Sequence, residues 1–313
     1  MSDEARSERI VSGLGQVNRN PVGWLLLIAL FGTLVYFFAF LKLFSGQQLS
    51  TFVWAWQAWN PETNYEHAKL IPLVVVFLVW ASRDKLKTAT VSSSPWGWLF
   101  IGIGLFLFFA GARTLQARLT LTAFPVLLFG IVLYLWGTQI ARILLFPIAF
   151  LVFMVPLNFI TQATFRLQFL ETAIASRVCN LIGIHVHTIG TVVNSADNKF
   201  RFEIDEGCSG IRSLMAIAMI SAVYAHFTQD RLWKKLAIFA ASLLFAVIGN
   251  AGRLVSIFVM ARFFGQDLAG GPYHAISGYL SFPFAIAAMV LFGMLLNIKL
   301  GQGSQPEKER LGV

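Results

Sequence analysis

The residues best suited to chemistry lie in the stretch 201–214, which reads RFEIDEGCSGIRSL and leads into a long apolar run. Cys208 is the candidate nucleophile in this stretch, since a thiolate attacks carbonyl carbon and is favoured by the N-terminal end of a helix and by nearby cations. Glu206 and Arg212 flank it and have either a structural role or a contact with substrate. Ser209 is a weaker candidate, because no Gly-x-Ser-x-Gly elbow surrounds it.

Two further polar residues, Arg253 and His274, interrupt otherwise apolar runs near the C-terminus. A histidine can protonate a leaving amine and then activate an acceptor, and an arginine can stabilise the oxyanion formed when a thiolate attacks a carbonyl. Asn250 lies one helical turn before Arg253 on the same face, where it would orient Arg253 or the substrate backbone. Together these residue types indicate acyl transfer through a thioester.

The composition decides which elements must position these residues. Of the 313 residues, 57% are hydrophobic and 12% are charged, with mean hydropathy +0.70. A soluble domain has about twice that charged fraction, so the pattern predicts an all-α, polytopic membrane bundle of about eight transmembrane helices. The expected spans are 22–43, 68–82, 96–111, 121–138, 143–158, 209–227, 233–262 and 275–298.

The distribution of Lys and Arg predicts the orientation of these spans. Basic residues gather in alternate loops, which places both termini in the cytoplasm by the positive-inside rule. We therefore expect a single integral-membrane domain over 1–313, with cytoplasmic tails at 1–21 and 299–313 and an extracytoplasmic insertion at 159–207. The residues expected inside are Arg6, Arg9, Arg19, Arg83, Lys85, Lys87, Arg142, Arg231, Lys234, Lys235, Lys299, Lys308 and Arg310.

The insertion at 159–207 contains two patterns. Its first half has apolar residues at helical spacing, which predicts a small helix lying in the membrane interface or capping the bundle. Its second half alternates with the period of a strand around the turn residues 194–198, which predicts a β-hairpin that delivers the chain to Cys208.

This topology brings the polar residues to one depth. Counting from Leu236 to Arg253 gives 17 residues, or roughly 26 Å of helix, which puts Arg253 at the outer edge of the hydrocarbon. The next helix begins beside His274 and descends, and the helix after Cys208 starts on the same side. We expect Cys208, Arg253 and His274 to meet at the outer face.

In several sequence blocks the chain resembles the exosortase/archaeosortase family of membrane-embedded cysteine transpeptidases. EGCSGIRSL at 206–214, GNAGRL at 249–254 and YHAISGYLSF at 273–282 are similar to the family blocks that bear the catalytic Cys, Arg and His. YEHAKLIPLVVVFLVWASR at 65–83 resembles an early family block, with Ala68 in place of the usual Gly. His67 in that block either contributes to the site or lies at the interface.

The resemblance implies a protein-sorting enzyme that needs no cofactor or metal. Such enzymes recognise exported proteins by a C-terminal signal, which consists of a short motif of the Pro-Glu-Pro type, a transmembrane helix and a basic cluster. They cleave at the motif and pass the new C-terminus to an unidentified lipid, glycan or amine acceptor. The resemblance further implies the bacterial inner membrane, an active site on its extracytoplasmic face, and association with exopolysaccharide export.

Several alternatives remain beside this interpretation. The basic residues form no continuous stripe, so the net charge of +9 is no argument for nucleic acid as a partner. A disulfide could join Cys179 to Cys208 in an oxidising periplasm. His185 and His187 make a poor metal site and fit solvated surface better. The rival function is a non-enzymatic transporter or scaffold of a polysaccharide export system, although we find no inverted repeat of the transporter type.

Overall fold

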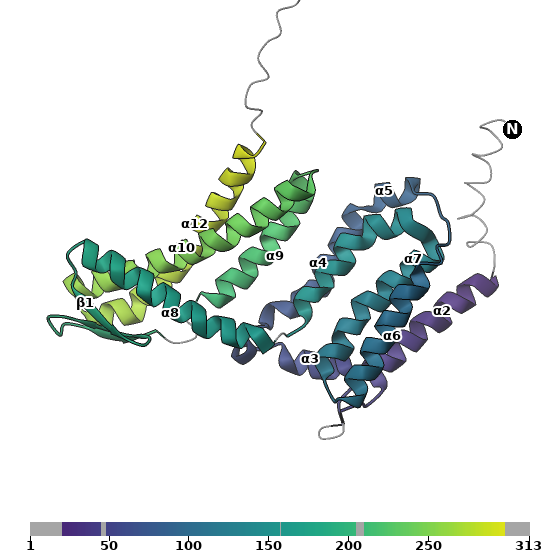
Figure 1. Cartoon of the computed structure of the whole chain (residues 1–313), viewed down its shortest axis with the longest axis horizontal. Helices are drawn as coiled ribbons and strands as arrows, with labels where there is room; N and C mark the ends of the chain where they lie inside the picture. Colours follow the sequence, from purple (N-terminus) through teal and green to yellow (C-terminus); the bar gives the residue numbers. More distant parts are fainter. Residues whose placement is uncertain (1–20, 45–47, 157, 205–209, 298–313) are drawn as a thin grey trace, which may run out of the picture. The chain divides into compact units, whose positions relative to one another are not determined.

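The computed structural model describes residues 21–44, 48–156, 158–204 and 210–297, and these are mostly helical (Figure 1). Cys208, Glu206 and Ser209 lie outside the described residues. The chain divides into two compact units, residues 1–159 and 160–313. Each unit is described by itself below.

Four helical segments in the described ranges are long and apolar enough to cross a membrane: Ala117–Met154, Ile211–Thr228, Leu232–Phe264 and Gln266–Leu295. Two shorter apolar helices are Leu25–Phe40 and Gly97–Arg113. A bilayer core requires about 20 residues of helix, so the four long segments establish an integral membrane protein.

The first unit contains short helical segments around a pair of long helices. Its elements are α2 (Pro21–Val35), η1 (Tyr36–Phe40), α3 (Thr51–Ala58), η2 (Pro61–Thr63), η3 (Glu66–Leu70), α4 (Ile71–Ala81), α5 (Arg83–Thr88), α6 (Gly97–Arg113), α7 (Ala117–Phe150) and η4 (Leu151–Met154).

Glycines allow α6 and α7 to pack closely. A Cβ placed on Gly97 would lie 2.5 Å from Tyr134 Cβ, and one on Gly111 would lie 2.7 Å from the Thr120 amide nitrogen. These pairs run in opposite directions along the two helices, so α6 and α7 are antiparallel. The glycines are seven residues apart through Gly104, which keeps them on one face of α6.

A break at Gly137 divides α7 into two segments. Gly137 has φ +82°, and a Cβ there would lie 1.8 Å from the carbonyl oxygen of Ser92, so this position requires glycine. The Ser92 amide donates to the Trp136 carbonyl at 3.3 Å across the same contact. The sequence predicted two separate spans, 121–138 and 143–158; the structure joins their residues in one element that changes direction at Gly137.

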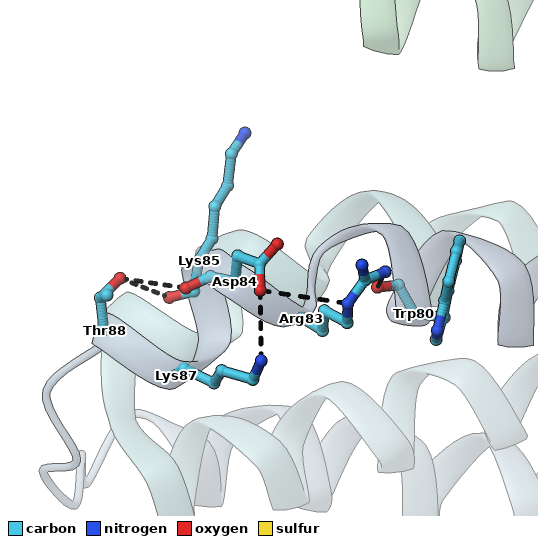
Figure 2. Close-up of polar contacts among 6 residues, drawn as sticks. All are labelled: Trp80, Arg83, Asp84, Lys85, Lys87 and Thr88. Atoms are coloured by element: carbon cyan, nitrogen blue, oxygen red, sulfur yellow. Dashed lines mark hydrogen bonds and ion pairs between the residues drawn. The ribbon is translucent and has the colours of Figure 1, made fainter.

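The end of α4 and the start of α5 form a basic cluster (Figure 2). The guanidinium of Arg83 lies 4.1 Å from the centre of the Trp80 ring, and Lys87 pairs with Asp84 at 3.3 Å. These side chains are exposed, so the pairs contribute little to stability. The aromatic ring beside cations is typical of a helix end at a membrane interface.

The second unit is a three-helix bundle with a small sheet at one end (Figure 1). Apolar residues of α9, α10 and α12 form its core, among them Ile217, Ala246 and Ala285. The elements are α8 (Asn158–Leu181), β1 (Val186–Ile189), β2 (Val192–Ser195), β3 (Arg201–Glu203), α9 (Ile211–Thr228), α10 (Leu232–Phe264), α11 (Gln266–Leu268), η6 (Ala269–Tyr273) and α12 (His274–Leu295).

The sheet has three antiparallel strands in the order β1-β2-β3, where the sequence predicted a single hairpin. The residues predicted to form the first strand of the hairpin form two strands, β1 and β2, which are joined by a turn at Gly190. The φ of +65° at Gly190 suits a tight turn. The second turn, with Asn198 at φ +56°, lies in the predicted turn region. The strand β3 ends at Glu203, and the predicted delivery of the chain to Cys208 lies outside the described residues.

The helix α8 buries its polar face. Thr164, Gln168, Glu171, Thr172 and Ser176 are buried, whereas Leu170 and Val178, on the apolar face recognised in the sequence, are exposed. An apolar exterior over a polar interior suits a helix in contact with lipid, and the expected interfacial location of this helix stays a prediction.

Candidate functional site

Arg253 and His274 are in contact, as the topology predicts. Arg253 lies about two thirds of the way along α10, and His274 is the first residue of α12. Arg253 Nη2 lies 3.2 Å from His274 Nε2 and donates a hydrogen bond to the His274 carbonyl oxygen at 3.3 Å. The turn through η6 therefore brings a permanent cation and an imidazole together at one end of the bundle.

Ser277 completes this group, although the sequence analysis did not select it. Arg253 Nε donates to Ser277 Oγ at 3.2 Å, and Ser277 Oγ donates to the His274 carbonyl oxygen at 2.9 Å. The signal was present, because Ser277 is three residues after His274 and three-residue spacing puts both on one face of a helix. Ser277 holds the guanidinium in an orientation that brings Arg253 Nη2 to the imidazole.

The contact with Arg253 involves Nε2 of His274. A guanidinium has donors and no acceptor, so Nε2 accepts from Arg253 in the tautomer that carries its proton on Nδ1. In this arrangement His274 can accept a proton at Nε2 once Arg253 turns toward another acceptor.

Asn250 connects three elements of the second unit. Its side chain is 4% exposed, and its Nδ2 donates to Glu171 Oε2 on α8. A Cβ on Gly210 would lie 2.8 Å from Asn250 Cγ, so the amide lies directly against the Gly210 backbone. Gly210 has φ +65° and is the N-cap of α9. Asn250 thus supports the start of the helix that follows Cys208, and its predicted role toward Arg253 or the substrate stays a prediction.

Glu171 is the second residue that the sequence analysis missed. It is 0% exposed, and its Oε1 has no hydrogen-bond partner in the described part of the chain. Burial raises the pKa of Glu171 to about 8, against the opposing effects of the Asn250 hydrogen bond and the Arg253 charge. The carboxyl is therefore mostly protonated at neutral pH. Its signal in the sequence was a lone acid among polar residues at helical spacing.

Two grooves adjoin the Arg253–His274 pair. Arg253 lines one of about 400 Å³ between α10 and α12, together with Gly252, Ser256, Tyr273 and Ser277. His274 lines another of about 210 Å³, together with Phe202, Glu203 and Ile204 at the end of β3. An extended peptide could occupy these grooves and reach both polar residues.

The remaining predicted site residues are separate from this group or outside the described residues. Cys208 and Glu206 belong to the latter. Arg212 is exposed on the first turn of α9. His67 belongs to the first unit, where burial lowers its pKa and its Nε2 has no hydrogen-bond partner in the described part of that unit. Its contribution to the site stays a prediction.

The other residues considered in the sequence have clear locations. Cys179 is a free, buried thiol on α8, and burial raises its pKa to about 11, so it is poorly reactive. The alternative of a Cys179–Cys208 disulfide does not hold in this structure. His185 and His187 are exposed. Within the described ranges, no group of three or more His, Cys, Asp or Glu residues is arranged to hold a metal ion.

Comparison with known proteins supports the same region. The pattern that defines the transmembrane exosortases matches residues 56–293, about three quarters of the chain, and includes Cys208, Arg253 and His274. Neither the curated proteins nor the solved structures give a significant match. Because the match covers far more than half of the sequence and the whole of the site, the chain belongs to the transmembrane exosortase family.

Proposed function

We propose that this protein is a membrane cysteine transpeptidase that processes exported proteins bearing a C-terminal sorting signal. Cys208 is the nucleophile, Arg253 stabilises the oxyanion, and His274 is the acid–base. The observation that carries the proposal is the contact between Arg253 and His274, two polar residues from different membrane helices. Polar groups at such a depth are costly and usually serve function.

The chain on both sides of Cys208 adjoins this pair. Ile204, before it, lines the same groove as His274, and Gly210, after it, contacts Asn250. Two Cα–Cα steps separate Cys208 from Gly210 and span at most about 7 Å.

In the first step the Cys208 thiolate attacks the carbonyl carbon of the scissile peptide bond. Arg253 donates hydrogen bonds to the negative oxygen of the tetrahedral intermediate. The C–N bond then breaks, and His274, which has taken the thiol proton, gives it to the leaving amine. The products are a thioester at Cys208 and the released C-terminal segment.

In the second step an acceptor amine, hydroxyl or water loses its proton to His274 and attacks the thioester carbonyl. The C–S bond breaks and restores the Cys208 thiolate. An amine, lipid or glycan acceptor makes the enzyme a transferase, and water makes it a protease. In both steps each bond that forms is matched by a bond that breaks, so neither step requires a redox partner or a metal.

We extend the proposal to the topology. The two shorter apolar helices, α4 and the division of α7 into two segments add to the four long spans. They bring the number of membrane helices toward the eight expected from the sequence. With α10 beginning beside Arg231, Lys234 and Lys235 in the cytoplasm, Arg253 lies near the outer surface. The active site then faces the extracytoplasmic side of a bacterial inner membrane, with both termini inside.

The test is to co-express the parent or the C208A variant with a reporter that carries a candidate sorting signal. We expect the parent to shorten the reporter and C208A to leave it intact, as measured by mass spectrometry. The mass of the new C-terminus identifies the acceptor. Equal shortening by both forms would exclude Cys208 as the nucleophile.

A further inference from the structure

Three elements of the second unit meet at Asn250. The α10 side chain donates its amide hydrogen bond to Glu171 of α8 and lies against the backbone of Gly210 at the start of α9. Apart from this bond, α8 and α10 contribute to one buried apolar cluster, which contains Ala175 and Cys179 of α8 and Leu254 and Phe258 of α10.

Asn250 and Arg253 are one helical turn apart on α10 and have different hydrogen-bond partners. Asn250 donates to Glu171 of α8, whereas Arg253 contacts His274 and Ser277 of α12. Glu171 is thus hydrogen-bonded to Asn250, and the charge of Arg253 acts on it through space. The influence of Glu171 would fall on the residue that Asn250 supports, which is Gly210.

The backbone at Gly210 has little conformational freedom. Its left-handed φ of +65° is favourable for glycine, and the 2.8 Å approach of Asn250 leaves no room for a side chain. The Leu214 amide donates to its carbonyl at 2.8 Å, which ties the turn to the first turn of α9. A shift of Asn250 would move the backbone two residues from Cys208.

We propose that Glu171 is a positioning residue for the transpeptidase reaction: its carboxyl holds Asn250 against Gly210, at the start of the helix that follows Cys208. This inference rests on the proposed function, in which Cys208 is the nucleophile. Glu171 lies outside the family blocks of the sequence and is far from all of them on the chain.

The environment of Glu171 favours the neutral carboxyl. The side chain has no exposure to solvent, and no Lys, Arg or His is paired with it in an ion pair among the described residues. Oε2 accepts from Asn250, and Oε1 remains to carry the proton. A glutamine has the same shape, with an amide oxygen to accept from Asn250 and an NH₂ group in place of the O–H.

The experiment measures the reactivity of Cys208 directly. Each variant is made in a C179A background and labelled with a membrane-impermeant maleimide, and reporter processing is measured in parallel. We expect E171Q to stay within about threefold of the parent in both rates and E171A to lose at least about tenfold in both. R177A, which removes an exposed charge from the same helix, is the matched control and should leave both rates unchanged.

Three outcomes would overturn the proposal. The labelling and processing rates of E171A could match those of the parent, which would remove any role for Glu171. The rates of E171Q could fall as far as those of E171A, which would mean that the ionised carboxylate is needed. If E171A fails to fold, as judged by thermal unfolding in detergent, E171Q and N250A decide. N250A should then lose Cys208 reactivity while E171Q keeps it, and the opposite result contradicts the inference.

The same design separates this inference from the proposed function. If Glu171 variants change maleimide labelling as expected while no form of the protein processes any reporter, the positioning of Cys208 stands and the transpeptidase assignment fails. If the parent processes the reporter and labelling does not respond to Glu171, the reverse holds.

Discussion

At the scale of single residues, the notable property of the site is a cation without an ion-pair partner among the described residues. Arg253 bonds to a hydroxyl, an imidazole and a carbonyl oxygen, none of which carries a negative charge. A carboxylate in that place would neutralise the guanidinium and compete with an oxyanion. These partners hold the guanidinium in position and leave its charge available to an incoming anionic oxygen.

The first prediction concerns the shape of this cation. R253K keeps the charge, but an ammonium cannot span Ser277 and His274 as the planar guanidinium does. We expect reporter processing to fall about 100-fold, in the range seen when one oxyanion donor is removed. Initial rates of reporter cleavage in proteoliposomes measure it.

The matched control is R262K, the same change two turns later on α10. Arg262 forms a partly exposed ion pair with Asp197 at 3.2 Å, and a lysine can replace it there at little cost. We expect a rate within about twofold of the parent. A processing rate for R253K near that of R262K would show that charge alone suffices at Arg253.

At the scale of helices, the contact between α6 and α7 depends on the absence of side chains. The interface glycines of α6 face α7 atoms at distances that no Cβ tolerates, whereas Gly102 on the same helix has nothing within 4 Å. Close backbone approach through small residues is a common source of helix association in membranes, where the hydrophobic effect contributes little.

The second prediction compares one substitution at two positions of α6. G111A introduces a methyl group 2.7 Å from the Thr120 amide nitrogen and should destabilise the protein by about 1–3 kcal/mol through overpacking. G102A should be neutral or stabilise by up to about 1 kcal/mol, since alanine is the better helix former. Thermal unfolding in detergent measures both. Equal shifts for the two variants would mean that the close packing is not present.

The helices also show how far the sequence could be interpreted. The meeting of Arg253 and His274 followed from counting regular helical rise between basic clusters and turns, which requires no knowledge of packing. The break at Gly137 and the fold of the sheet at Gly190 depend on single left-handed glycines, and the sequence carries many glycines that do not turn. Those elements could not be placed in advance.

Glu171 and Ser277 illustrate the second limit. Their types and spacing were visible, but the bond of Glu171 to Asn250 depends on which face of α8 meets α10, and this is a tertiary fact. The exposed apolar residues of α8, such as Leu170 and Val178, were visible at helical spacing in the sequence. The function of the opposite, polar face required the structure.

At the scale of the whole molecule, orientation in the membrane decides whether the proposed chemistry is possible. Exported substrates present their signal on the outer side, so the site must face that side. The cluster of Arg83, Lys85 and Lys87 at α5 (Figure 2) is expected in the cytoplasm. The sheet of the insertion is expected outside.

The third prediction tests this orientation with single cysteines in a C179A/C208A background. Ser93 and Asn198 are both exposed, the first between α5 and α6 and the second in the turn between β2 and β3. In intact cells an impermeant maleimide should label N198C and leave S93C unlabelled. Permeabilised cells, in which both must react, are the control. Labelling of S93C alone in intact cells would invert the topology and place the site in the cytoplasm.

The buried polar face of α8 has a practical consequence for anyone who wishes to isolate the insertion. Residues 158–204 would be the natural fragment to express in water, since they hold a complete helix and sheet. Removed from α10, however, this fragment would lose the partner of Glu171 and still present Phe165, Phe169 and Leu170 to solvent. Such a fragment would aggregate or bind vesicles, so structural and binding studies of the insertion require the full chain in lipid or detergent.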